Sequence, residues 1–183
     1  MFSRLFSITR CMTVAALVAP VLLTAPSEAS QRDKAFFKRV SGNWQGPGEI
    51  VAGKYKGTKF VCKLSGDALS AKGVGLKLDG NCRVGVFSQP MSATITKNGS
   101  TYTGKFLDGA NGKGLDIRSG AVSGDKVVMT INRQKLNGAM IARLVDEKTM
   151  NITISVKVED RMIPVIGMSL NRKTDALAVG SIE

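Results

Sequence analysis

Histidine, the side chain that most often serves catalysis and metal binding near neutral pH, is absent from all 183 residues of this sequence. Its absence excludes nucleophile pairs in which histidine acts as the base, and zinc sites that contain histidine. It also removes the usual proximal haem ligand, although tyrosine takes that place in some proteins. We therefore predict no catalytic residue, no metal site and no cofactor.

The acidic residues offer few other ways to do chemistry. Glu49 lies in the first predicted strand among apolar residues and could act as an acid or anchor a ligand if it pointed inward; an outward, paired position is the alternative that we favour. The Gly-rich segment 107–116 lacks the ending of a phosphate-binding P-loop and the spacing of an EF-hand. An enzyme that uses Glu49 or Asp108–Asp116 is a minor hypothesis, and a non-enzymatic protein is the prediction.

The first 29 residues have the pattern of a secretory signal peptide. Arg4 and Arg10 make the beginning basic, and residues 13–25 are mostly apolar. Ser27 and Ala29 place small residues at the −3 and −1 positions of a cleavage site. The apolar run of about 13 residues is shorter than the roughly 20 that a membrane-spanning helix needs. We therefore expect cleavage after Ala29 and export to the periplasm.

The predicted mature chain, residues 30–183, has the length of a single domain and carries excess positive charge. The whole sequence has a formal net charge of +12, and removal of Arg4, Arg10 and Glu28 leaves +11. Its lysines are dispersed, and such a charge attracts anionic partners. In the periplasm we expect an anionic envelope component rather than nucleic acid, for which one Trp and two Tyr offer few stacking surfaces. We expect no transmembrane segment in the mature chain.

Two cysteines, Cys62 and Cys82, remain after cleavage, and an even number in an exported chain indicates a disulfide. Two buried free thiols are the alternative. Phe60, Cys62 and Leu64 share one face of a predicted strand. A hairpin that turns near residues 71–72 would place Cys62 close to opposite Cys82, at a separation that a disulfide can span.

Past residue 44, apolar and polar residues alternate, with turn signals at short intervals. The pairs Asn98-Gly99, Gly124-Asp125 and Asn137-Gly138 are typical of tight hairpin turns. Alternation places one face of each segment in the core and the other in solvent. We predict one helix, over Gln31–Val40, and nine or ten strands, at 44–53, 57–66, 73–83, 86–97, 100–107, 113–122, 126–134, 139–145, 149–158 and 163–171.

Consecutive hairpins make an antiparallel up-and-down meander, which hides its apolar face either as a sandwich or as a closed barrel. Closure also removes the exposed edge strands. We therefore predict an all-β protein in which the meander closes as a calycin-like barrel of about 8–10 strands, with a short N-terminal helix. Residues 30–183 would form this single domain.

The helix that leads into SGNWQGPGEI, residues 41–50, resembles the beginning of calycin barrels, the lipocalins and their relatives. In those families a Gly-x-Trp motif opens the first strand, and its tryptophan packs across the closed end of the barrel. The resemblance implies that Gly42 and Trp44 close the barrel. It also implies an arginine from the last strand stacked on the tryptophan, for which Arg172 is the candidate by position. The chain is similar in general style to small exported barrels of Gram-negative bacteria, including protease and lysozyme inhibitors with one disulfide.

A barrel of this size can hold a small molecule inside. Several methionines and aromatic residues have inward parity, and methionine makes adaptable apolar walls, although ordinary core filling is the explanation that we favour for the methionines. We predict that a small apolar or amphipathic ligand is bound by Phe60, Tyr102, Phe106, Met129 and Met168. The alternative is a cell-envelope or inhibitor protein that acts through its cationic outer surface on an anionic envelope component or a protein partner.

Overall fold

The computed structural model describes residues 28–69, 73–107 and 114–174. The predicted signal peptide lies outside these ranges except for residues 28 and 29, so cleavage and export stay predictions. Within these ranges, no helix has the length and apolar character needed to cross a bilayer.

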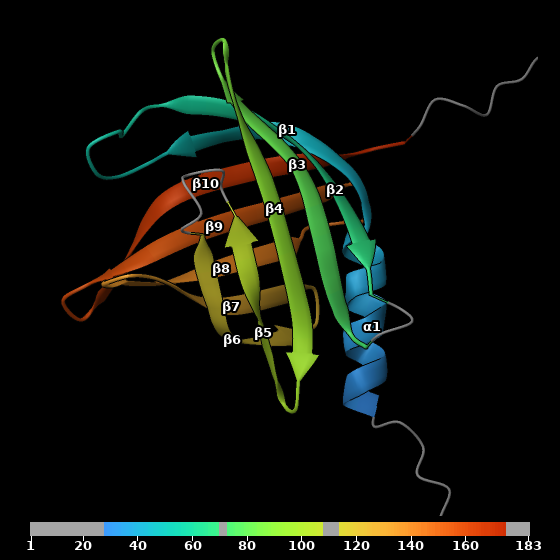
Figure 1. Ribbon diagram of the computed structural model, residues 1–183. Coiled ribbons are helices and arrows are strands. Elements are labelled where there is room, and N and C mark those ends of the chain that lie inside the picture. Colours follow the sequence, from blue (N-terminus) through green and yellow to red (C-terminus); the bar gives the residue numbers. More distant parts are fainter. Residues whose placement is uncertain (1–27, 70–72, 108–113, 175–183) are drawn as a thin grey trace, which may run out of the picture.

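One helix and ten strands make up the described part of the chain (Figure 1). Each strand pairs antiparallel with its neighbours in sequence, and the first strand pairs with the last, so the meander closes as a barrel. The predicted fold class is confirmed, and the sandwich alternative is wrong. The elements are α1 (Glu28–Val40), β1 (Gly42–Ile50), β2 (Lys59–Ala68), β3 (Gly75–Val84), β4 (Phe87–Asn98), β5 (Thr101–Leu107), β6 (Leu115–Ser123), β7 (Lys126–Arg133), β8 (Leu136–Leu144), β9 (Thr149–Val158) and β10 (Arg161–Lys173).

Each predicted strand range overlaps one of these strands, but one predicted turn is wrong. Asn137-Gly138 lies inside β8, where Asn137 is opposite Asn132 of β7. The β7–β8 turn is instead at Gln134-Lys135, and Gln134 adopts a positive φ of 54°. Glutamine rarely takes this conformation, so the sequence carries no signal for it.

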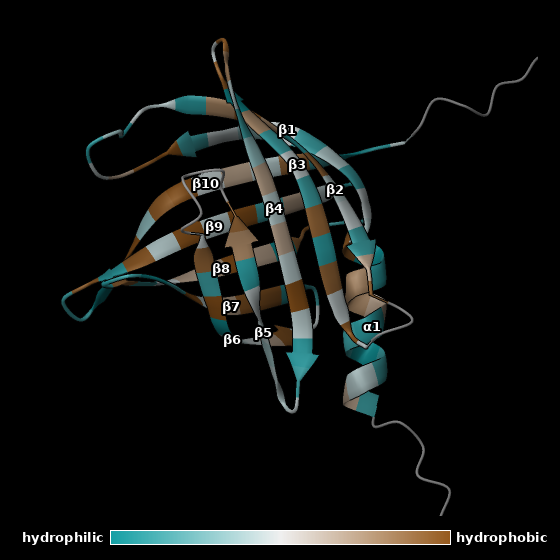
Figure 2. Cartoon of the chain, viewed as in Figure 1, coloured by the Kyte–Doolittle hydropathy of each residue, from teal (hydrophilic) through white to brown (hydrophobic). Residues whose placement is uncertain are grey.

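Residues at every second position of the strands face the barrel axis, and the apolar bands that result are visible along the strands in Figure 2. On β7, Val127, Met129 and Ile131 are buried, whereas the intervening Val128 and Thr130 are not. The core formed by these inward side chains is most completely buried near α1. Trp44, Leu64, Leu144, Met150 and Leu170 are all buried there together with residues of the helix.

Helix α1 packs against one end of the barrel and closes it (Figure 1). Its apolar side, with Phe36, Phe37 and Val40, is buried in the core. Trp44 follows immediately in β1 and is 1% exposed. Its indole Nε1 donates a hydrogen bond of 2.9 Å to the carbonyl of Val40, which ties the last turn of the helix to the first strand.

Arg172 of β10 lies directly opposite Trp44 in the β1–β10 ladder and stacks on its ring, with the guanidinium carbon 4.3 Å from the ring centroid. The same guanidinium donates hydrogen bonds to the carbonyls of Ser41, Arg39 and Glu147. Gly42 adopts a φ of 108°, and a Cβ atom there would lie 2.8 Å from Nη1 of Arg172. Glycine is therefore required both for the backbone turn into β1 and for the approach of the arginine.

Two further sets of polar contacts hold α1 in place. Asp33 accepts hydrogen bonds from the Tyr102 hydroxyl, at 2.6 Å, and from Lys97 Nζ, at 2.7 Å. Arg39 forms exposed ion pairs with Asp125 and Glu147, which lie in the β6–β7 and β8–β9 connections. Besides β1 and β10, the helix is thus fastened to β4, β5 and the β6–β7 and β8–β9 connections.

Replacement of Arg172 by lysine should lower the free energy of unfolding by about 2 kcal/mol, because a lysine cannot donate to three carbonyls and stack on an indole together. Urea unfolding followed by circular dichroism measures the change. Arg143→Lys, the same substitution at an exposed position of β8, serves as the control and should change the stability by less than about 0.5 kcal/mol. Equal stabilities of the two variants would contradict the role given to Arg172.

Tyr102 should make the protein sensitive to alkaline pH. Burial raises the pKa of the Tyr102 phenol above its ordinary value of 10, and the hydrogen bond to Asp33 raises it further. Since the folded state then holds its proton more tightly than the unfolded state, stability is fully present below pH 10 and falls as the pH rises above it. Tyr102→Phe should reduce the slope of stability against pH between pH 10 and 11 by up to about 1.4 kcal/mol per pH unit. Tyr55→Phe, at a residue 62% exposed, should leave this slope unchanged.

Candidate functional site

The end of the barrel away from α1 is where the interior remains accessible. The β1–β2, β3–β4, β7–β8 and β9–β10 connections lie at this end, because β1 begins next to the helix and every strand reverses direction. We call it the open end. Inward apolar side chains near it are only partly buried, in contrast to those beside the helix: Phe60, Met91, Phe106, Leu115, Met140, Ile154 and Met168.

A cavity of about 30 Å³ lies inside the barrel on the side of strands β4 to β9. All the residues that line it are apolar: Ala93, Ile95, Phe106, Leu115, Ile117, Ile131, Met140 and Ile154. Its volume holds about two water molecules, whereas sites for larger organic ligands measure roughly 300 Å³ or more. A ligand with a long apolar chain would therefore have to displace mobile side chains such as Met140 toward the open end.

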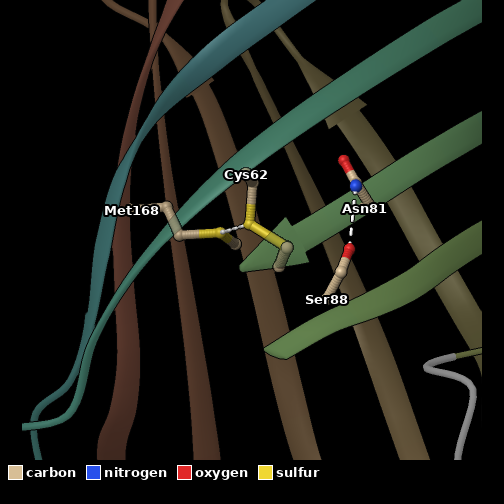
Figure 3. Close-up of a disulfide and its surroundings, with 5 residues drawn as sticks. Cys62, Asn81, Ser88 and Met168 are labelled. Atoms are coloured by element: carbon tan, nitrogen blue, oxygen red, sulfur yellow. Dashed lines mark hydrogen bonds between the residues drawn. A yellow bond between two sulfur atoms is a disulfide. The ribbon is translucent and has the colours of Figure 1, made fainter. Parts of the chain in front are cut away.

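The disulfide joins β2 and β3 and forms part of the interior wall on the side of the barrel opposite the cavity (Figure 3). Cys62 and Cys82 are paired directly across the β2–β3 ladder, with their Cα atoms 4.0 Å apart, so the predicted bridge and register are confirmed. Cys62 is completely buried, and its Sγ lies 3.9 Å from Sδ of Met168. This contact is one of packing, since a disulfide sulfur carries no hydrogen to donate.

The five predicted ligand-binding residues do not form one site. Phe106 lines the cavity, whereas Phe60 and Met168 lie near the disulfide, where a Cβ atom at Gly48 would touch both. Met129 is fully buried deeper in the barrel. Tyr102 belongs to the closed end, because it is 1% exposed and hydrogen-bonded to Asp33 of the helix. The alternation of residues along each strand predicted that all five side chains face inward. It does not give their depth along the barrel axis.

Several residues that line the cavity, among them Met140 and Ile154, are not among the five predicted ligand-binding residues. The alternation along β8 and β9 gives both residues an inward position. Met140 is opposite Met129 in the β7–β8 ladder, and Ile154 is opposite Met140 in the β8–β9 ladder. The β8–β9 register could be predicted from the sequence, but the predicted turn at Asn137-Gly138 would have placed Met129 opposite Asp146 instead of Met140.

A basic side chain, Arg133, follows the inward series of β7 at the open end. It lies two residues after the buried Ile131, and its Nε atom is itself buried. A guanidinium at the boundary between an apolar interior and solvent is suited to hold an acidic headgroup whose apolar chain points inward.

The carboxylates considered for catalysis do not meet in the interior. Glu49 is on the outer face of β1, between the inward-facing Gly48 and Ile50. Residues 108–113 of the Gly-rich segment lie outside the described ranges. Within those ranges, no three side chains among Cys, Asp and Glu cluster closely enough to hold a metal ion.

No family model and no curated protein matches this sequence. Among solved structures, the crystal structure of Rv2717c from M. tuberculosis is similar, with a TM-score of 0.57. The two chains are 10% identical over 78% of this chain and 98% of that chain. At this identity the likeness shows the barrel fold alone, and the resemblance to calycins stays a prediction.

Removal of the disulfide should lower the free energy of unfolding by about 3 kcal/mol, since the bridge closes a loop with a sequence separation of 20 residues. Urea unfolding of the oxidised and reduced protein measures the difference. The double variant Cys62→Ala/Cys82→Ala should show no dependence on reductant. If titration detects two free thiols in the reduced protein and its stability equals that of the oxidised form, the expected stabilisation is absent.

Proposed function

We propose that this protein is a non-enzymatic periplasmic carrier or sensor that binds a small amphipathic molecule in the outer half of its barrel. The observation that carries the proposal is the difference between the two ends. Near α1 most of the inward side chains are buried, whereas near the open end an apolar wall from seven strands remains partly accessible. An apolar surface of this kind in a concave position favours a ligand with an apolar chain.

The position of Arg133 supports a ligand with an acidic headgroup. The apolar chain would enter between Met140, Ile154 and Phe106, and the headgroup would stay near the guanidinium and solvent. The positive net charge of the chain favours the approach of such an anion. The predicted export would place the protein where acidic amphiphiles of the cell envelope occur.

Titration with dansyl-undecanoic acid, whose fluorescence rises in apolar surroundings, tests the proposal. The intrinsic fluorescence of Trp44 is unsuitable because its ring is sealed at the closed end. Met140→Glu should weaken binding of the probe by on the order of tenfold or more, because it places a charge in the apolar wall. The methyl ester of the probe should bind more weakly than the acid, since it cannot pair with Arg133.

Ile141→Glu is the matched control, because Ile141 is the next residue of β8 and is 39% exposed on the outer face. It should bind the probe as the wild type does. If Met140→Glu unfolds at a temperature close to that of the wild type and binds equally well, the interior is not the binding site.

A further inference from the structure

Exposed apolar side chains gather at the open end of the barrel. Of the twelve large hydrophobic residues that are exposed in the described ranges, nine lie in or beside its connections: Val51, Tyr55, Val84, Val86, Phe87, Leu107, Leu136, Val158 and Met162. Two others are on the outer wall, and Val145 alone lies at the closed end. Exposed apolar residues that were scattered singly over the surface would not be concentrated at one end.

The tip of the β3–β4 hairpin is the most exposed part of this set. Val86 is 83% exposed and Phe87 is 78% exposed. The tip projects beyond the other connections at the top of Figure 1, and it is coloured as hydrophobic in Figure 2. Neither side chain is part of the buried core, so folding does not account for their apolar character.

Turn geometry does not account for the valine either. Three hairpin turns have a glycine of nearly the same positive φ, which is 56° at Gly85, 60° at Gly99 and 59° at Gly124. The residue after the glycine is Ser100 or Asp125 in the two turns at the closed end, and it is Val86 at the open end. Polar residues are usual at such positions, so Val86 departs from what this backbone needs.

Basic residues also occur in other connections of the open end. The β1–β2, β3–β4 and β7–β8 connections, residues 51–58, 85–86 and 134–135, contain three basic residues and no acidic one: Lys54, Lys56 and Lys135. The connections near α1 differ, since Asp125 and Glu147 there pair with Arg39. In the β9–β10 connection the charges balance, and Lys157 pairs with Asp160.

We propose that the open end docks on the surface of an anionic lipid bilayer. Val86 and Phe87 insert at the level of the headgroups, and the lysines of the β1–β2 connection contact the lipid phosphates. Apolar tips combined with lysine and arginine are the features that bind proteins to such surfaces. A protein partner fits less well, because lysine is depleted at the centre of protein interfaces and these apolar residues are divided among separate connections.

Docking in this orientation does not depend on the proposed interior ligand. If both hold, the open end faces the bilayer, and an acidic amphiphile passes between membrane and barrel without crossing bulk water.

Co-sedimentation with vesicles of phosphatidylglycerol and phosphatidylcholine tests the docking. The wild type should bind the mixed vesicles, bind pure phosphatidylcholine weakly, and dissociate as the salt concentration rises. Val86→Ser/Phe87→Ser should bind on the order of tenfold more weakly, because two inserted side chains are lost. Lys54→Glu/Lys56→Glu should bind roughly thirtyfold or more weakly.

Matched controls lie at the closed end. Val145→Ser removes an apolar side chain that is 57% exposed, and Lys38→Glu/Lys148→Glu makes the same change in net charge on exposed residues near α1. Both should bind the vesicles as the wild type does. In addition, the fluorescence of Phe87→Trp should be quenched by brominated lipids, whereas that of wild-type Trp44 should not.

Equal binding by Val86→Ser/Phe87→Ser and the wild type would overturn the proposal. Absence of wild-type binding to the anionic vesicles would overturn it too, as would a stable dimer that Phe87→Ser abolishes. If vesicle binding is absent while dansyl-undecanoic acid still binds inside the barrel, the docking fails and the interior site stands. If Met140→Glu still binds vesicles but no longer binds the probe, docking on the bilayer and binding inside the barrel are confirmed as separate properties.

Discussion

The stacking of Arg172 on Trp44 is the contact on which the closed barrel depends. These residues are opposite each other where the first and last strands meet, so their pairing closes the sheet. The three carbonyls that accept hydrogen bonds from Arg172 belong to the end of α1, to the residue after it and to the β8–β9 connection. One planar cation therefore joins helix, first strand, last strand and a neighbouring loop. A side chain with fewer donors could not satisfy these groups together.

The sealed end explains why the other end is available. With α1, Trp44 and Tyr102 filling one end, most of the inward side chains described there are buried. Ten strands make a wider barrel than eight, and alanine at positions 93 and 142 contributes little volume to its interior. The inward faces toward the open end are consequently apolar but only partly covered. This unequal filling distinguishes the two ends of the barrel.

Much of the fold could be predicted because period-two alternation and glycine-containing turns are local signals. They defined all ten strands. The even number of cysteines predicted the disulfide, and the predicted hairpin placed Cys62 close to opposite Cys82. The β7–β8 turn was misplaced because Gln134 adopts a left-handed conformation without a residue that favours it. Depth along the barrel axis was not predictable from parity, so Tyr102 was grouped with Phe106 although they lie at different levels. The charge pattern of the open end was also hidden, because only the topology shows that the β1–β2, β3–β4 and β7–β8 connections lie at the same end of the barrel.

The pairing of β1 with β10 also constrains the order in which the molecule can fold. Trp44 lies near the beginning of the described chain and Arg172 near its end, so the contact between them has almost the largest sequence separation available. The hairpins between them can form locally, but the ring of strands stays incomplete until the C-terminal strand arrives. During synthesis the edges of β1 and β9 would therefore remain unpaired, and this is the stage at which the chain is most exposed to aggregation.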